Sequence, residues 1–376
     1  MSNDTRRILR SAAKQQESIS QPSSLRPPLD APPAPEHPII TILRGSKLPN
    51  LSPAECKLFR EKQLRLSNDT PHTRASVSGQ HLRTALEASL IFAQHEAGSA
   101  VCIHPAGWVL TCAHCFGETE EEYLASPKTR WLLFYDGRAV QAECRAWDAK
   151  RDLALLKIIA IESDGASAGI GPNSRNNNNR NDHDHDADAS FPFVALSDYK
   201  PAVHTPIICI GQPGSEDLES ATDRKTDYGL VEVSRGAFKG MVPGADPCDN
   251  SEIGTLKHDA WTYWGHSGAP LLNTADGSLI GLHSSWDDRT RMRHGVPLVA
   301  IEMFLQEHGE VMRAESVGQR VCTILADGKK EVRQRGLVQS LAARPMAGVQ
   351  APCENGNADV IVISSDSSDD GHGETL

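Results

Sequence analysis

The sequence predicts an all-β fold, built as barrels or as a sandwich. Between about residues 80 and 312, short apolar runs of strand-type composition recur, and turn-forming residues separate them. Several such runs in series are typical of barrels and sandwiches. The runs cover residues 99–104, 107–112, 130–135, 153–159, 206–211, 228–234, 269–273, 278–284 and 296–301. An amphipathic segment at 300–312 predicts a closing C-terminal helix.

The two ends of the chain have compositions that favour disorder over a packed core. Residues 1–48 are rich in Ser, Pro and Gln and predict a disordered arm. Residues 49–79 predict a helical or linker segment, because Ser52 and Pro53 have the types that begin helices. Residues 313–376 are polar again and predict a largely disordered tail.

A polar insertion interrupts the folded part, residues 80–312. The stretch 163–190 contains an Asn run followed by alternating His and Asp residues. Such an alternation could hold a metal ion. Expansion of a tolerated surface loop explains it better, because long loops cost little closure entropy. We therefore expect no metal ion and no other cofactor.

Charge and cysteine usage exclude several classes of protein. A formal net charge of −11 argues against direct binding of nucleic acid. No apolar run is long enough to span a bilayer, and the N-terminus lacks the apolar core of a secretory signal. Nine scattered cysteines indicate reduced thiols, and we expect a nuclear or cytosolic protein without membrane association. Cys112 and Cys115 have the spacing of a zinc pair, but no second pair accompanies them, so we interpret them as buried thiols.

Three residues with the chemistry of a serine nucleophile occur in the order His, Asp, Ser. His114 directly follows an apolar run, Asp152 begins the next one, and Ser267 stands in "GHSG". Acyl transfer by a serine needs a base, a carboxylate that orients the base, and donors for the oxyanion. Each residue alone is ordinary, but the three together in this order predict a catalytic triad. Asp148 is an alternative orienting carboxylate, although its position favours a turn.

The segments around these residues resemble the trypsin-like peptidase fold, in the style of Deg/HtrA-type and glutamyl endopeptidases. "GSAVCIHPAGWVLTCAHC", "DLALLKI", "IICIGQPG" and "GHSGAPLL" with "GSLIGLHS" carry the resemblance, which covers residues 80–312. It implies two six-stranded antiparallel β-barrels with the triad between them. It also implies that the backbone N–H groups of Gly265 and Ser267 form the oxyanion hole.

The same resemblance suggests which residues line the substrate pocket. Thr262, five residues before Ser267, and the pair His283 and Ser284 match positions of the primary specificity pocket. Glutamyl endopeptidases carry a hydroxyl residue and a histidine at the first two of these positions. Their hydrogen bonds to a carboxylate would favour acidic residues before the scissile bond. The alternative is that His283 is a buried histidine beneath an apolar pocket.

The C-terminal tail contains four β-branched residues followed by serines and acids, residues 360–370. Such a run can add as a strand to the sheet of another protein, with its acidic end against basic residues. It resembles a SUMO-interaction motif, which implies SUMO or SUMO-modified proteins as partners. The apolar part is Val360, Ile361, Val362 and Ile363, and the acidic part includes Asp366, Asp369 and Asp370. An accidental apolar patch or a last strand is the alternative.

The sequence therefore predicts a serine endopeptidase that acts on a protein or peptide substrate. The competing hypothesis is a catalytically silent scaffold that keeps the peptidase fold and recruits SUMO-modified partners through its tail.

Overall fold

A computed structural model describes residues 39–94, 98–163, 190–216 and 224–316, and the backbone of two further strands at 321–324 and 330–333. Residues 1–38, most of the predicted loop 163–190 and the tail motif 360–370 lie outside the described residues. Within the described part, no helix combines the length and the apolar composition needed to cross a membrane.

Six antiparallel strands form an N-terminal barrel. Their order is β7-β4-β3-β2-β5-β6, and the pairing of β6 with β7 closes it. The strands are β2 (Ser89–Phe92), β3 (Ser99–His104), β4 (Trp108–Thr111), β5 (Thr129–Phe134), β6 (Ala139–Asp148) and β7 (Leu153–Ser163). Its interior is filled by apolar side chains that include the fully buried Trp108, Leu110 and Leu155.

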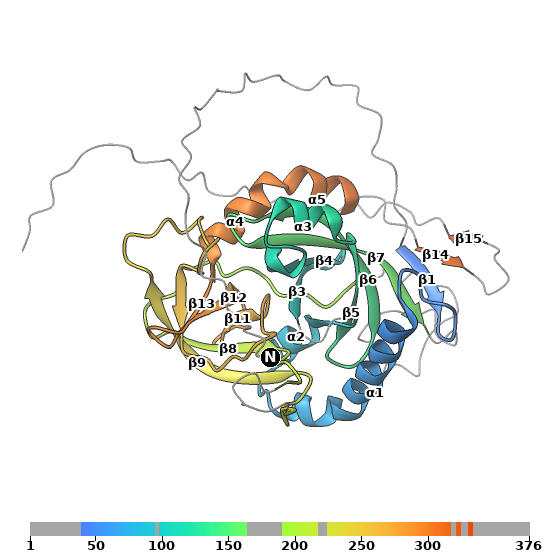
Figure 1. The fold of residues 1–376 in the computed structure, drawn as a ribbon, viewed down its shortest axis with the longest axis horizontal. Helices are drawn as coiled ribbons and strands as arrows, with labels where there is room; N and C mark the ends of the chain where they lie inside the picture. Colours follow the sequence, from blue (N-terminus) through green and yellow to red (C-terminus); the bar gives the residue numbers. More distant parts are fainter. Residues whose placement is uncertain are drawn as a thin grey trace, which may run out of the picture. The chain divides into compact units, whose positions relative to one another are not determined.

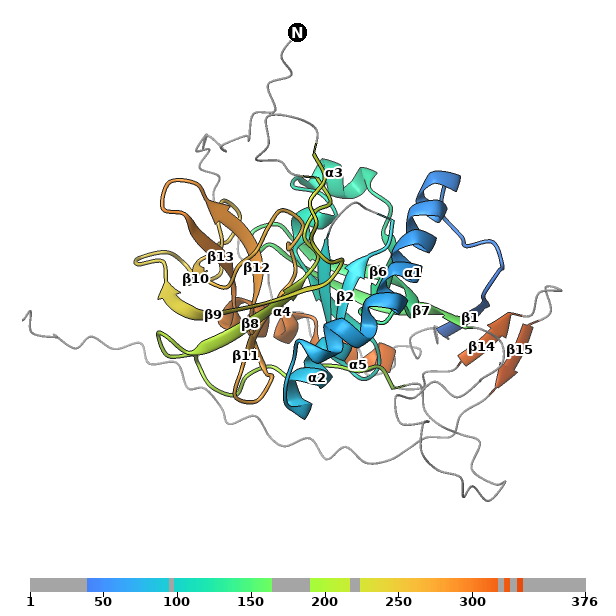
Figure 2. The ribbon, with the colours of Figure 1, turned by 90° about the horizontal axis from the view of Figure 1, so that it is seen from below.

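Six further strands form a second closed barrel, in the order β10-β13-β12-β11-β8-β9. They are β8 (Pro206–Gly211), β9 (Glu232–Met241), β10 (Leu256–His258), β11 (Pro270–Asn273), β12 (Leu279–Asp287) and β13 (Met292–Pro297). In both views the two sets of strands form separate groups side by side (Figures 1 and 2). The predicted fold of two six-stranded antiparallel barrels is therefore confirmed, and the open choice between barrels and a sandwich is decided for barrels.

A three-strand extension continues the N-terminal barrel and differs from the sequence prediction. β1 (Ile39–Leu43) pairs in parallel with β7, β14 (Val321–Ile324) pairs in parallel with β1, and β15 (Lys330–Arg333) pairs antiparallel with β14. Residues 39–48 thus belong to the folded part and not to the predicted arm 1–48. Likewise, the predicted tail 313–376 begins inside a helix and contains two strands.

The closing helical segment begins earlier than predicted and is divided. α4 (Leu298–Glu307) and α5 (Gly309–Ser316) replace one helix at 300–312, and the predicted run 296–301 contains the last two residues of β13 and the first four of α4. Pro297 stands at the boundary as N-cap, where a missing N–H suits the start of a helix. Phe304 of α4 is fully buried, and Arg151 of the N-terminal barrel pairs with Glu307 at 2.6 Å. α4 therefore contacts both barrels, the N-terminal one through Arg151 and the other at β12 and β13.

Two helices precede the N-terminal barrel, α1 (Pro53–Ala75) and α2 (Gln80–Glu87). The 3₁₀ turn η1 (Ala113–Cys115) and the short helix α3 (Glu120–Ala125) lie between β4 and β5. α1 begins with Ser52 as N-cap and a capping box with Glu55. It covers the outside of the barrel, on the side seen in Figure 2. Phe59 of α1 packs edge-on against Trp131, with ring centroids 5.6 Å apart, and Arg60 pairs with Glu162 at 2.6 Å.

Candidate active site

Strand pairing brings His114 and Asp152 together. β4 and β7 are antiparallel neighbours, with Thr111 opposite Ala154. His114 follows β4 in the turn η1, and Asp152 lies directly before β7. Both residues therefore emerge at the same end of the same strand pair. Asp152 has a positive φ of 54°, a conformation that Asp tolerates better than most residues.

The Asp152 carboxylate is buried and holds the imidazole of His114. Its two oxygens lie 2.9 and 3.0 Å from His114 Nδ1, and Oδ1 also accepts the backbone N–H of His114 at 3.1 Å. The hydroxyl of Ser284 donates to Oδ2 at 2.6 Å. Asp148, the alternative, instead accepts from the amide and the guanidinium of Arg151. The predicted orienting carboxylate is thus the one that contacts His114.

These contacts keep Asp152 ionised. Burial by itself would raise the pKa of this carboxyl, but the charge of His114 and the hydrogen bonds from His114 and Ser284 outweigh burial. The pKa of Asp152 is therefore lowered from its usual value. An ionised carboxylate against Nδ1 fixes the tautomer in which the proton sits on Nδ1 and Nε2 is free to act as a base.

Ser284 has a different environment from the one predicted. The resemblance placed it in the substrate pocket, but its side chain is buried and bonded to Asp152. A buried carboxylate needs several donors, and the Ser284 hydroxyl is one of them. The Ser284 side chain therefore supports Asp152, and the assignment of Ser284 to the substrate pocket stays a prediction.

The loop that carries Ser267 is attached to the N-terminal barrel. The Ser267 carbonyl accepts the N–H of Ser99 at 2.9 Å, and the Ser99 hydroxyl donates to the Gly265 carbonyl at 3.3 Å. The Thr111 hydroxyl in turn donates to the Ser99 carbonyl at 2.7 Å. Because Thr111 stands three residues before His114, these bonds fix the serine loop beside the histidine turn. Among the described residues, the structure records no hydrogen bond for the Ser267 hydroxyl itself.

Two glycines allow this close approach. Gly268 has a φ of +81°, and a Cβ there would lie 2.2 Å from the Ser99 carbonyl oxygen. Gly265 has a φ of +101°, which also favours glycine. In the bend between Gly265 and Gly268, some backbone N–H groups form hydrogen bonds and others do not. His266 N–H bonds Tyr263 and Gly268 N–H bonds His283, whereas the N–H groups of Gly265 and Ser267 have no partner in the described part of the chain.

Thr262 and His283 lie in a region of the C-terminal barrel that is rich in histidine. His283 is buried, and its Nδ1 lies 3.0 Å from Nε2 of His258, which is also buried. The ring of His266 stands edge-on to that of His283, with centroids 6.3 Å apart. The Thr262 hydroxyl accepts a hydrogen bond from Nε of Arg293 at 3.2 Å. Sequence reasoning missed His258 and Arg293, because only the strand register brings them to the predicted pocket residues.

Burial keeps these histidines neutral. It lowers the pKa of His258 to about 3 and that of His266 to about 4, and the positive charge of Arg293 adds to both effects. The pKa of His283 is lowered well below its usual value, first by burial and then by His258 and His266. At neutral pH these rings are therefore uncharged hydrogen-bonding groups.

Comparison with known protein families agrees with this geometry. Residues 98–282 match the family model of the trypsin-like peptidase domain. The match contains His114, Asp152 and Ser267 and ends directly before His283. No curated protein matches the chain. Together with the two six-stranded barrels, the match supports a chymotrypsin-fold peptidase.

Within the described residues, one group has metal-ligand chemistry, and it overlaps the His114–Asp152 pair. The ligand atoms of Cys112, His114 and Asp152 lie within 4.8 Å of one another. The Cys112 thiol donates to the His283 carbonyl at 3.4 Å. Burial and then the charge of Asp152 raise its pKa well above the usual value, which disfavours the thiolate that metals prefer. The group therefore fits a hydrogen-bonded pair better than a metal centre.

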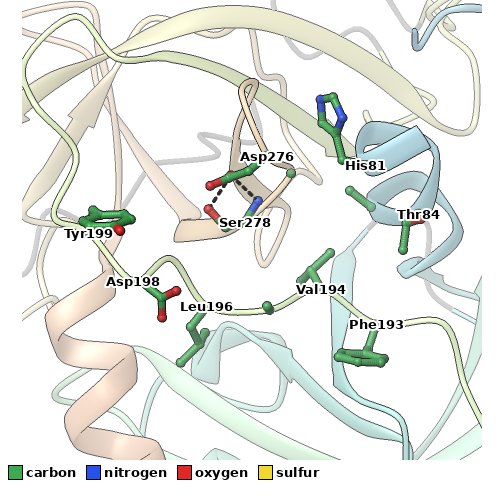
Figure 3. Close-up of a pocket in the computed structure, with 12 residues that line it drawn as sticks. His81, Thr84, Phe193, Val194, Leu196, Asp198, Tyr199, Asp276 and Ser278 are labelled. Carbon is green, nitrogen blue, oxygen red and sulfur yellow. Dashed lines mark hydrogen bonds between the residues drawn. The ribbon is translucent and has the colours of Figure 1, made fainter. Parts of the chain in front are cut away.

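A hollow of about 320 Å³ lies elsewhere on the protein (Figure 3). His81 and Thr84 of α2, residues 193–196, 198 and 199, and the turn between β11 and β12 line it. In that turn, Asp276 accepts hydrogen bonds from the hydroxyl and the amide of Ser278 at 2.7 and 2.9 Å. None of the predicted site residues lines this hollow.

The buried histidines predict that acid destabilises the fold. Because the folded pKa values of His258 and His266 are depressed, the unfolded chain binds more protons below pH 6.5, and stability falls as the pH decreases toward 4. At pH 5 each ring costs on the order of 2 kcal/mol relative to pH 7. Urea denaturation at pH 7, 6 and 5 measures this loss.

His258→Gln removes one of these rings. The unfolding free energy that is lost between pH 7 and pH 5 should therefore be smaller by about 2 kcal/mol than in the wild-type chain. The matched control is His72→Gln, which replaces an exposed histidine of α1 in place of a buried one. Equal pH dependence in wild type and His258→Gln would contradict the assignment of a neutral, buried His258.

Proposed function

We propose that this chain is a serine endopeptidase that cleaves peptide bonds through an acyl-enzyme on Ser267. The observation that carries the proposal is the bond of His114 Nδ1 to a buried, ionised Asp152, beside a loop whose Gly265 and Ser267 amides are free. The arrangement thus supplies a general base, a carboxylate that orients the base, and amide donors for an oxyanion, all around the loop that carries Ser267. The closer likeness to Deg/HtrA-type and glutamyl endopeptidases is part of the proposal and rests on the sequence motifs.

In the proposed mechanism, His114 Nε2 takes the hydroxyl proton of Ser267 as Oγ attacks the substrate carbonyl carbon. Asp152 stabilises the imidazolium that forms. The N–H groups of Gly265 and Ser267 donate to the negatively charged oxygen of the tetrahedral intermediate. The imidazolium then gives its proton to the leaving amine. In the second half of the reaction, His114 takes a proton from a water molecule that attacks the acyl carbon, and the imidazolium returns the proton to Ser267 Oγ as the acid product leaves. The missing bond between Ser267 and His114 does not conflict with this role, because such bonds often tighten only when substrate is bound.

The proposed substrate preference is for an acidic residue before the scissile bond. Thr262 and His283 are supported as pocket residues by their positions relative to the Ser267 loop, since the His283 carbonyl accepts the Gly268 N–H at 2.9 Å. If His258 donates to His283 Nδ1, then His283 Nε2 carries the proton and can donate it to a carboxylate. Neutral His283 and Thr262 then supply hydrogen bonds but no charge.

The direct test is hydrolysis of a fluorogenic peptide library by the purified full-length chain. We expect cleavage after Glu or Asp at least 10-fold faster than after Gln, Asn, Leu or Lys. Ser267→Ala and His114→Ala should each lower kcat/KM by a factor of 10³ or more. Ser126→Ala, in which a serine outside this site is replaced, serves as the control.

Cleavage that persists in Ser267→Ala would overturn the assignment of the nucleophile. Absence of any cleavage by the folded wild-type chain would favour the scaffold hypothesis. Efficient cleavage without selectivity for acidic residues would leave the mechanism standing and remove the proposed preference.

A second proposal concerns the tail, for which the sequence pattern is the support. We propose that Val360–Ile363 adds as a strand to a SUMO protein and that Asp366, Asp369 and Asp370 contact basic residues there. SUMO as a partner would place the chain in the nucleus or the cytosol. The seven free cysteines of the described part support the same proposal, because thiols stay reduced in these compartments. Titration calorimetry should detect SUMO binding by the full chain, and Val362→Asp with Ile363→Asp should abolish it. Binding that survives both substitutions would contradict this proposal.

A further inference from the structure

An arginine that sequence analysis missed lies at the predicted substrate pocket. Arg293 stands on β13, directly opposite Trp286 of β12. Its Nε donates to the hydroxyl of Thr262 at 3.2 Å, and its guanidinium carbon lies 4.9 Å from the centre of the Trp286 ring. The side chain is held on two sides by these contacts. It is partly buried but not enclosed.

Among the described residues, no carboxylate forms an ion pair with Arg293. Its positive charge is therefore not neutralised by this part of the chain. Asp259 attracts Arg293 electrostatically, but that carboxylate is bonded to Lys239 at 2.6 Å. Asp287, on the strand that faces β13, accepts instead from Thr290 and from the amide of Arg289. A partly buried cation without a partner is costly, so this position favours an anion from outside the chain.

The neighbouring histidines cannot supply a positive charge at neutral pH. His283 and His258 are buried and neutral, and the cation of Arg293 contributes to that state. Arginine stays protonated in proteins, whereas these imidazoles do not. Arg293 is thus the fixed positive charge beside Thr262 and His283.

We propose that Arg293 determines specificity by binding the carboxylate of an acidic side chain that precedes the scissile bond. The inference rests on the proposed peptidase function and names the group that reads the substrate. Because Nε is occupied by Thr262, the two terminal nitrogens of the guanidinium remain to donate to a carboxylate. Thr262 orients the guanidinium, and the Trp286 ring supports its face.

Product-like peptides test this role without requiring turnover. The inactive Ser267→Ala chain is titrated with peptides that end in Glu or Asp and with matched peptides that end in Gln or Asn. We expect the acidic peptides to bind about 10- to 100-fold more tightly than the amides. Arg293→Met in the same background should remove this difference while leaving the binding of the amide peptides nearly unchanged.

Arg289→Met is the matched control, because Arg289 is an exposed arginine in the turn before β13. It should retain the full preference for the acidic peptides. Circular dichroism and urea denaturation establish that each variant folds. Should Arg293→Met destabilise the chain, Arg293→Lys keeps a charge and part of the stem and is expected to retain a reduced preference.

In the active chain, Arg293→Met should lower kcat/KM for cleavage after Glu or Asp about 10- to 100-fold and alter cleavage after Gln or Asn little. A preference for acidic peptides that survives in Arg293→Met overturns the role of Arg293 and leaves the peptidase proposal intact. If the wild-type chain cleaves nothing, the peptidase proposal fails, and the binding difference between acidic and amide peptides still decides the role of Arg293.

Discussion

The candidate site depends on one backbone contact between the two barrels, the hydrogen bond from Ser99 N–H to the Ser267 carbonyl. Ser99 begins β3 in the N-terminal barrel, and Ser267 stands just before β11 in the other. The Ser99 side chain and the Thr111 hydroxyl extend this contact, so the serine loop is fixed to the strands that lead to His114. No side chain fits at Gly268, which explains why a glycine follows the serine.

A second constraint is the buried charge of Asp152. A carboxylate out of water is unfavourable unless donors surround it, and His114 and Ser284 provide them from two different barrels. Loss of either barrel's contribution would leave the charge short of donors. The same bonds that stabilise the carboxylate fix the orientation of the imidazole, so stability and the arrangement of the site have a common cause.

Much of the fold and the His114–Asp152 pair could be predicted from the sequence, because strongly apolar runs report buried strands directly. Strand β6 escaped prediction, since Gln141 is buried and its neighbours lack a regular alternation. Strand β2 escaped because it is only four residues long and a single residue, Ala88, separates it from α2. The parallel pairing of β1 and β14 joins segments from opposite ends of the chain, a relation that local patterns do not contain. The register of β12 and β13, which shifts at a bulge between His283 and Ser285, sets Arg293 opposite Trp286. The contact of Arg293 with Thr262 joins β13 to the loop between β10 and β11, a relation that local patterns also do not contain.

Covalent labelling with a fluorophosphonate probe, followed by mass spectrometry of the labelled peptide, tests the central claim most directly. An activated serine reacts with such a probe, whereas an ordinary surface serine does not. The account predicts a single stoichiometric adduct on Ser267 that is lost in His114→Ala and strongly slowed in Ser284→Ala, in which Asp152 loses a donor. A folded wild-type chain that remains unlabelled, or that is labelled at another serine, would contradict it.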